Sequence, residues 1–114
     1  MIPKEITERI HEMYAREQDS AEAYQKIDNA ESAREAEMLT EELDYELANL
    51  ENDILAWVEG QPEFSDPDPE NPEKTPGYFH VAADVLRRHM GWEPFLFRLA
   101  DRWENFTWND VVGY

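Results

Sequence analysis

The chain has 114 residues, a formal net charge of -17 and no cysteine. This length suits one domain, and 41% hydrophobic residues are enough to form a core, which argues against global disorder. The charge disfavours binding to nucleic acid or anionic membranes and favours basic partners, and the lack of cysteine excludes disulfides and thiolate metal sites.

The first predicted element is a helix from about Pro3 to Ile27, because proline suits the first position of a helix. Its apolar residues recur at spacings of three, four and seven and form one stripe. Glu17 falls inside this stripe, where we expect it either to meet a cation or to mark a place where the stripe opens to water. The stripe consists of Ile6, Ile10, Met13, Tyr14, Ala21, Tyr24 and Ile27.

A second helix is predicted over residues 33–59, because Ser32 and Glu35 have the spacing of a capping box and Gly60 is a typical helix stop. On one continuous helix the two stripes would be out of phase by roughly a quarter turn. An antiparallel hairpin that turns near residues 28–31 is therefore favoured. The second stripe consists of Ala36, Leu39, Leu43, Leu47, Leu50, Ile54 and Trp57.

Residues 60–76 contain five of the seven prolines and no apolar periodicity, which predicts a loop with Phe64 as its apolar anchor. Thr75 and Pro76 start a third helix that Gly91 ends, Pro94 starts a fourth, and a short fifth is expected over residues 107–113. The inward residues expected in the third and fourth helices are Phe79, Ala82, Val85, Leu86, His89, Met90, Phe95, Leu96, Leu99, Trp103 and Phe106.

The predicted fold class is therefore all-α, with no sustained period-two alternation that would indicate strands. We expect a single domain over residues 1–114. It would comprise an antiparallel hairpin of two long helices (3–59), an acidic Pro-rich loop (60–76) and a smaller aromatic-rich unit of short helices (77–114).

Motifs for catalysis and metal binding are weak. Glu8 and His11 match the Glu-x-x-His element of di-iron bundles, but no second such element follows. The segment 66–70 resembles the start of a calcium loop, but its prolines and missing glycine turn disfavour an EF-hand. No nucleophile elbow or Gly-rich phosphate loop is present. We therefore expect a non-enzyme with no catalytic residue, metal or cofactor; an enzyme or metal protein using hairpin carboxylates is a third alternative.

The face of the second helix opposite its apolar stripe combines an aromatic and apolar residues with carboxylates: Met38, Glu41, Tyr45, Ala48, Asn52 and Leu55. Such a mixture is typical of interfaces in which an aromatic anchors the partner and charge sets the on-rate. The alternative is that this face packs on the C-terminal unit or another subunit. The predicted partner-binding residues are Glu37, Met38, Glu41, Glu42, Asp44, Tyr45, Glu51, Asp66, Asp68 and Glu70.

The acidic charge is concentrated in the middle of the chain. Residues 31–59 carry ten acids and one base, whereas residues 78–114 carry five acids and four bases. We expect those four arginines (Arg87, Arg88, Arg98 and Arg102) to pair with the acidic hairpin, within the chain or across a dimer. A helix of about 40 Å that carries a row of carboxylates can imitate nucleic-acid phosphates.

The function favoured by these features is a small acidic module that binds a basic surface of another protein, with a nucleic-acid-binding enzyme as the expected partner. The analogy, in charge and size only, is to anti-restriction and anti-CRISPR inhibitors of phages and mobile elements. The alternative is a structural or assembly subunit, a homodimer through the hairpin, whose acidity reflects solvation or a halophilic source. No apolar run is long enough for a membrane span, and we expect a cytoplasmic protein without direct contact to nucleic acid or membrane.

Overall fold

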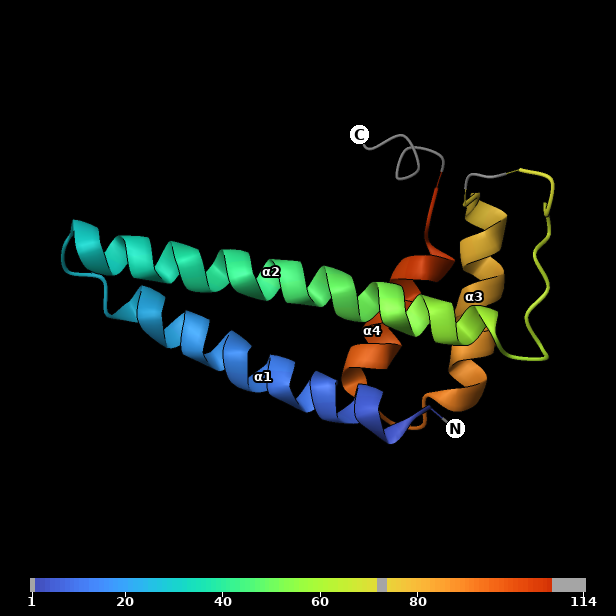
Figure 1. Cartoon of the computed structure of the whole chain (residues 1–114), viewed down its shortest axis with the longest axis horizontal. Helices are drawn as coiled ribbons and strands as arrows, with labels where there is room; N and C mark the ends of the chain where they lie inside the picture. The colour runs from blue at the N-terminus through green and yellow to red at the C-terminus, as the bar shows by residue number, and fades with distance from the viewer. Residues whose placement is uncertain (1, 72–73, 108–114) are drawn as a thin grey trace. The chain divides into compact units, whose positions relative to one another are not determined.

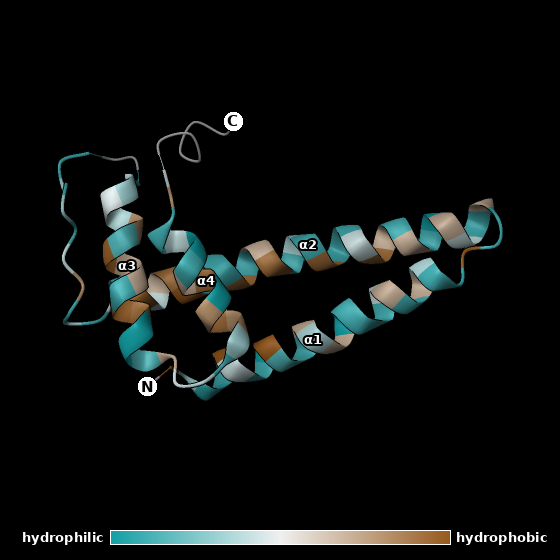
Figure 2. Cartoon of the chain, turned by 180° about the vertical axis from the view of Figure 1, so that it is seen from behind, coloured by the Kyte–Doolittle hydropathy of each residue, from teal (hydrophilic) through white to brown (hydrophobic). Residues whose placement is uncertain are grey.

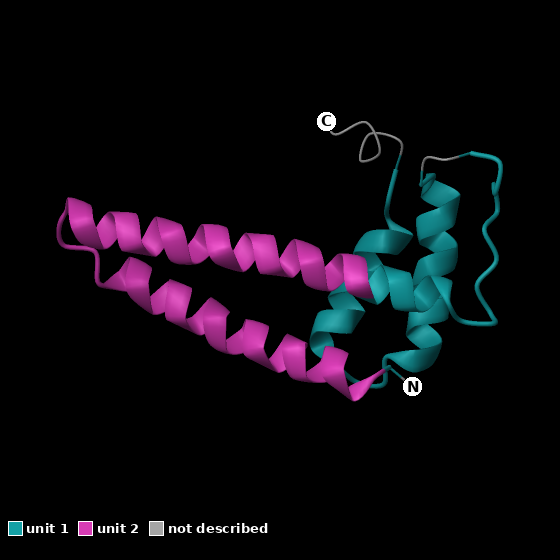
Figure 3. Cartoon of the chain, in the orientation of Figure 1, with its two compact units in different colours: residues 1–2, 54–114 teal, residues 3–53 magenta. Residues whose placement is uncertain are grey.

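The computed structural model describes residues 2–71 and 74–107, and within these residues it contains four helices and no strand (Figure 1). The helices are α1 (Lys4–Gln25), α2 (Ala30–Glu59), α3 (Pro76–His89) and α4 (Pro94–Glu104). The all-α prediction is confirmed. The chain divides into two compact units: residues 3–53, called the hairpin unit, and residues 1–2 with 54–114, called the C-terminal unit (Figure 3).

In the hairpin unit, α1 and the first part of α2 pack as an antiparallel pair. Arg9 contacts Asp53, and Ser20 contacts Thr40, so residue numbers rise on one helix as they fall on the other. The buried residues of each helix follow one another at spacings of three, four or seven, which keeps one face of each helix toward its neighbour. The buried hydrophobic residues of this unit are Ile6, Ile10, Met13, Ala36, Leu43 and Leu50.

The polar centre of this packed face differs from the predicted stripe. Ala21 is exposed, and Ser20 is buried in its place, with 7% of its surface exposed. The Ser20 hydroxyl lies 2.9 Å from that of Thr40, which donates to the carbonyl of Ala36 at 3.0 Å. A hydroxyl has one hydrogen, so Ser20 is the donor to Thr40. The predicted stripe missed this pair because it consisted of apolar residues alone.

The stripe also ends earlier than the sequence predicts. Glu17 is exposed, so of its two expected environments the structure shows the stripe opening to water. Beyond Ser20 the remaining large residues of the first stripe, Tyr24 and Ile27, are 47% and 40% exposed, and Leu39 of α2 is 40% exposed. The end of the hairpin near its turn therefore leaves apolar surface in solvent.

The caps of the long helices are shifted from their predicted positions. Ser32 is not the N-cap of α2, because the Asn29 side chain accepts from the backbone N–H of Ser32 at 2.9 Å while the Ser32 hydroxyl accepts from that of Asn29 at 3.2 Å. This reciprocal box starts the helix three residues earlier than predicted. At α1, Pro3 is the N-cap and not the first helical residue, and its carbonyl accepts from the N–H of Thr7.

In the C-terminal unit, α3 and α4 pack on each other, and their starts and stops follow the sequence signals. The Thr75 side chain accepts from the N–H of Tyr78, that of Glu93 accepts from Phe95, and Gly91 takes a left-handed φ of 60° after α3. Residues 108–113 of the predicted fifth helix lie outside the described residues. The buried residues of α3 and α4 are Tyr78, Ala82, Ala83, Val85, Leu86, Phe95, Leu96, Leu99, Ala100 and Trp103.

An aromatic cluster joins these helices to the loop. The Phe79 ring stacks on Phe106 with centroids 4.1 Å apart and meets the edge of Tyr78 at 5.5 Å. Tyr78 in turn contacts the half-buried Phe64 ring at 5.2 Å. Phe64 is thus the apolar anchor that the sequence predicts, and it docks on α3.

Described residues 60–71 and 74–75 form neither helix nor strand, as predicted. Pro67 lies close to the first turn of α3: a Cβ added at Gly77 would lie 3.3 Å from the Pro67 ring. Glycine at this position lets the loop contact the first turn of the helix.

The arginines of α3 pair within their own unit. Arg87 donates to Asp101 and Glu104 of α4 at 2.9 and 2.7 Å, and Arg88 donates to Asp84 at 3.0 Å. Burial lowers the pKa of Arg87, but the hydrogen bonds to the two carboxylates outweigh it, so the pKa is raised. Within the chain, the expected pairing of these two arginines with the hairpin is therefore wrong, since carboxylates one helix turn away or on α4 are already in reach. The expected pairing across a dimer stays a prediction.

Candidate protein-binding surface

Seven of the ten predicted binding residues lie on α2 within the hairpin unit. Glu37, Met38, Glu41, Glu42, Asp44 and Tyr45 are exposed, and Glu51 is half-buried. Figure 2 shows hydrophilic and hydrophobic residues interspersed around α2. At 100° per residue Met38, Glu41 and Tyr45 lie opposite the buried stripe, with Glu37, Glu42 and Asp44 on their flanks, and we call these six residues the outer face. Glu51 lies closer to the buried stripe and is not part of this face.

Two apolar residues are prominent on the outer face. The Tyr45 side chain is 71% exposed and Met38 is 53% exposed. Leu55 was predicted to share this face, but it is 4% exposed, and it belongs to the C-terminal unit. The prediction for Leu55 is wrong because it extended the helical pattern past residue 53, where α2 enters a second core.

The carboxylates of α2 differ in their ion pairing. Arg16 of α1 pairs with Glu46, and Arg9 pairs with Asp53 at 2.6 Å. These two acids lie on the edge of α2 that faces α1. Among the described residues, no ion pair or hydrogen bond engages the carboxylates of the outer face, namely Glu37, Glu41, Glu42 and Asp44. The outer face therefore keeps its charge available for a partner.

The three predicted binding residues of the loop, Asp66, Asp68 and Glu70, lie in a different compact unit from those of α2. Asp66 accepts from the backbone N–H of Asp68 at 2.9 Å, so its carboxylate shapes the turn. Asp68 and Glu70 are exposed. All three belong to the C-terminal unit, and the candidate surface is accordingly defined on α2 alone.

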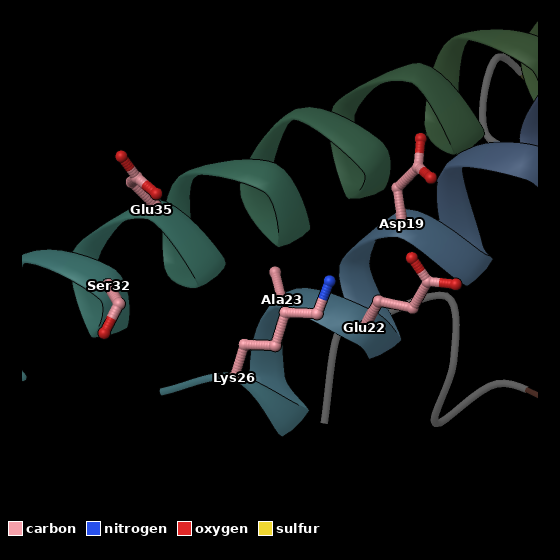
Figure 4. Close-up of a pocket in the computed structure, with 6 residues that line it drawn as sticks. All are labelled: Asp19, Glu22, Ala23, Lys26, Ser32 and Glu35. Atoms are coloured by element: carbon pink, nitrogen blue, oxygen red, sulfur yellow. The ribbon is translucent and has the colours of Figure 1, made fainter. Parts of the chain in front are cut away.

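A shallow depression lies between the two helices of the hairpin near its turn (Figure 4). Its polar groups are three carboxylates, one ammonium and one hydroxyl, and the ammonium of Lys26 partly offsets the acids. Within the described residues, no three His, Asp or Glu side chains are grouped so that they could hold a metal ion. The depression is lined by Asp19, Glu22, Ala23, Lys26, Ser32 and Glu35.

The C-terminal unit contains a titratable pair that sequence reasoning missed. Glu63 Oε1 lies 3.3 Å from Nε2 of His89, whose side chain is 16% exposed and meets the edge of Trp57 with centroids 5.2 Å apart. The pKa of Glu63 is lowered, because a hydrogen bond from its own backbone outweighs the opposing effect of burial, and His89 and Arg88 lower it further. The separation of 26 positions left no local signal for this pair.

A second exposed aromatic group was also missed. Trp92, in the turn between α3 and α4, is 90% exposed, and its ring lies 6.2 Å from that of Phe97, which is 38% exposed. Trp92 lies between Gly91, which takes a left-handed φ, and Glu93, which caps α4.

Comparison of the chain with protein-family models, curated proteins and solved structures found no match. Within the described residues, no helix combines the length and the hydropathy needed to cross a bilayer.

Proposed function

We propose that this chain is a non-enzymatic, cytoplasmic binding protein whose outer face of α2 engages a basic surface on another protein. The observation that supports it is the contrast between the two sides of α2. On the side toward α1, Glu46 and Asp53 pair with arginines, whereas the acids of the outer face surround an exposed Tyr45 and have no partner among the described residues. Exposed aromatics set among charge are typical of interface anchors.

The spacing of these acids supports a nucleic-acid-binding protein as the partner. Glu37, Glu41, Glu42 and Asp44 are spread over seven residue steps, a rise of about 10.5 Å, so their three unequal intervals average about 3.5 Å along the axis. One strand of duplex DNA carries a phosphate every 3.4 Å or so. The outer face can thus offer the basic groove of a partner a linear density of negative charge similar to that of DNA, as inhibitors that mimic nucleic acid do.

Affinity capture from the native host, washed with increasing salt, tests this proposal. We expect a basic nucleic-acid-binding protein to be retained at low salt and released at high salt. The triple variant Glu41→Lys, Glu42→Lys, Asp44→Lys should lose this capture.

The matched control reverses three exposed acids of α1, Glu12, Asp19 and Glu22, and changes the net charge by the same amount. The control should retain the partner. Salt-dependent capture that survives the outer-face triple reversal would contradict the proposal.

A structural or assembly subunit is the second candidate, because the hairpin end exposes Tyr24, Ile27 and Leu39 at 40% or more. Association of two hairpins would cover this apolar surface. Sedimentation over a range of concentrations tests it: a dimer that Tyr24→Ser with Ile27→Ser converts to a monomer supports assembly, and a wild-type monomer at all concentrations contradicts it.

A further inference from the structure

The outer face of α2 repeats the pattern of a helix-packing seam. Met38, Glu41, Tyr45, Ala48 and Asn52 follow one another at spacings of three, four, three and four, and all five are exposed. This is the spacing by which one helix packs along another. We call these five residues the outer seam.

The hairpin itself shows how α2 binds a helix. On its inner side, α2 receives the apolar residues of α1, and Arg9 and Arg16, seven residues apart, pair with the flanking acids Asp53 and Glu46. A central row of apolar residues with arginines along its edge is thus the pattern that complements α2. The outer seam has the corresponding parts: the exposed apolar Met38, Tyr45 and Ala48, and on its flanks Glu37, Glu42 and Asp44, which have no ion pair among the described residues.

We propose that the outer seam receives a basic amphipathic helix of the partner protein. This inference rests on the proposed function and specifies the partner element. Apolar side chains of that helix, spaced by three and four, would cover Met38 and Tyr45, and the small Ala48 would allow close approach. Lys or Arg side chains along its edges would meet Glu37 and Asp44 on one side and Glu42 on the other.

The outer seam of a second copy does not complement the outer seam of this chain. Two copies would bring Glu41 and the flanking carboxylates of one seam against those of the other, and like charges across such a contact are destabilising. Charge complementarity therefore selects a basic helix over self-association.

Binding of two fluorescent peptides to the full chain tests the inference. The first is a synthetic three-heptad peptide with Leu at its seam positions and Arg at its edges, and the second has the same composition in a scrambled order that gives no apolar face. Fluorescence anisotropy should show the amphipathic peptide binding at least tenfold more tightly than the scrambled one. Tyr45→Ala should weaken the amphipathic peptide about tenfold, whereas the control Tyr24→Ala, on α1, should not.

The outcomes separate the inference from the proposed function. Equal binding of the two peptides, or tight binding unchanged by Tyr45→Ala, overturns the helix-docking inference and leaves a basic surface as the target. Failure of both peptides to bind at low salt counts against the helix and against the proposed function together. Dimerisation of the chain that Tyr45→Ala abolishes would show that a second copy occupies the seam, and would also overturn the inference.

Discussion

The hydrogen bond between the buried Ser20 of α1 and the half-buried Thr40 of α2 offers a quantitative test of the hairpin. Ser20 donates to Thr40 over 2.9 Å, Thr40 donates to the Ala36 carbonyl over 3.0 Å, and Ser20 is 7% exposed. We consider the variants Ser20→Ala and Thr40→Val and their combination. Each single change removes one partner of the pair, and the double change replaces both with apolar groups of similar shape.

The expected magnitudes follow from which groups lose their partners. Ser20→Ala removes one neutral hydrogen bond and should lower the free energy of unfolding by about 1 kcal/mol. Thr40→Val leaves the Ser20 hydroxyl without its acceptor, which costs about 1–2 kcal/mol, less if serine turns to a carbonyl of its own helix. The double variant should lie close to the wild type, because no buried hydroxyl is left unpaired. The coupling energy, the sum of the two single costs minus the double one, is then about 2–3 kcal/mol.

Urea denaturation of the four proteins in a double-mutant cycle measures this coupling. Thr7→Val, more than three helical turns from Ser20, is the control partner and should be additive with Ser20→Ala. Additivity of Ser20→Ala and Thr40→Val within about 0.3 kcal/mol would refute the direct hydrogen bond.

Three further predictions concern single side chains. Glu17→Leu should keep the helices and change the free energy of unfolding by no more than about 0.5 kcal/mol, because Glu17 is exposed, and the variant should self-associate more readily. A melting curve with a mass measurement in solution checks this. Unfolding of the variant would reveal a polar network that Glu17 supports. Phe64→Ala should accelerate proteolysis of the loop, since Phe64 docks on α3, whereas Phe97→Ala should not; equal cleavage rates would argue against this anchor. Glu63→Gln should destabilise at neutral pH only: the lowered pKa of Glu63 means that its ionised form stabilises the fold above its unfolded pKa and that this contribution is lost as the pH falls through the folded value. Urea unfolding of the wild type and of Glu63→Gln at neutral and acidic pH measures the difference in their free energies of unfolding. A difference that is larger at acidic pH than at neutral pH would contradict the prediction.

Helix positions were accessible from sequence because their signals are local. Pro76 and Pro94 lack the N–H that a first helical position does not need, and Gly91 takes the left-handed φ that ends a helix. The exposed carboxylates and Tyr45 on one face of α2 also followed from the helical period alone. The N-cap of α2 was misplaced because Asn29 and Ser32 both carry cap-forming side chains, and only geometry shows which accepts from which N–H.

The sequence by itself determined the helical class, the hairpin, the loop and the distribution of charge, since these depend on residue type and on spacing along the chain. Only the tertiary structure decided which polar side chains pair with residues that are distant in the sequence. It buries Ser20 against Thr40, leaves Glu17 in water, and joins Glu63 to His89. It also decides that, among the described residues, Glu46 and Asp53 of α2 pair with arginines of α1 whereas the acids of the outer face pair with none. Pairing requires atoms from distant positions to come within a few ångströms of each other.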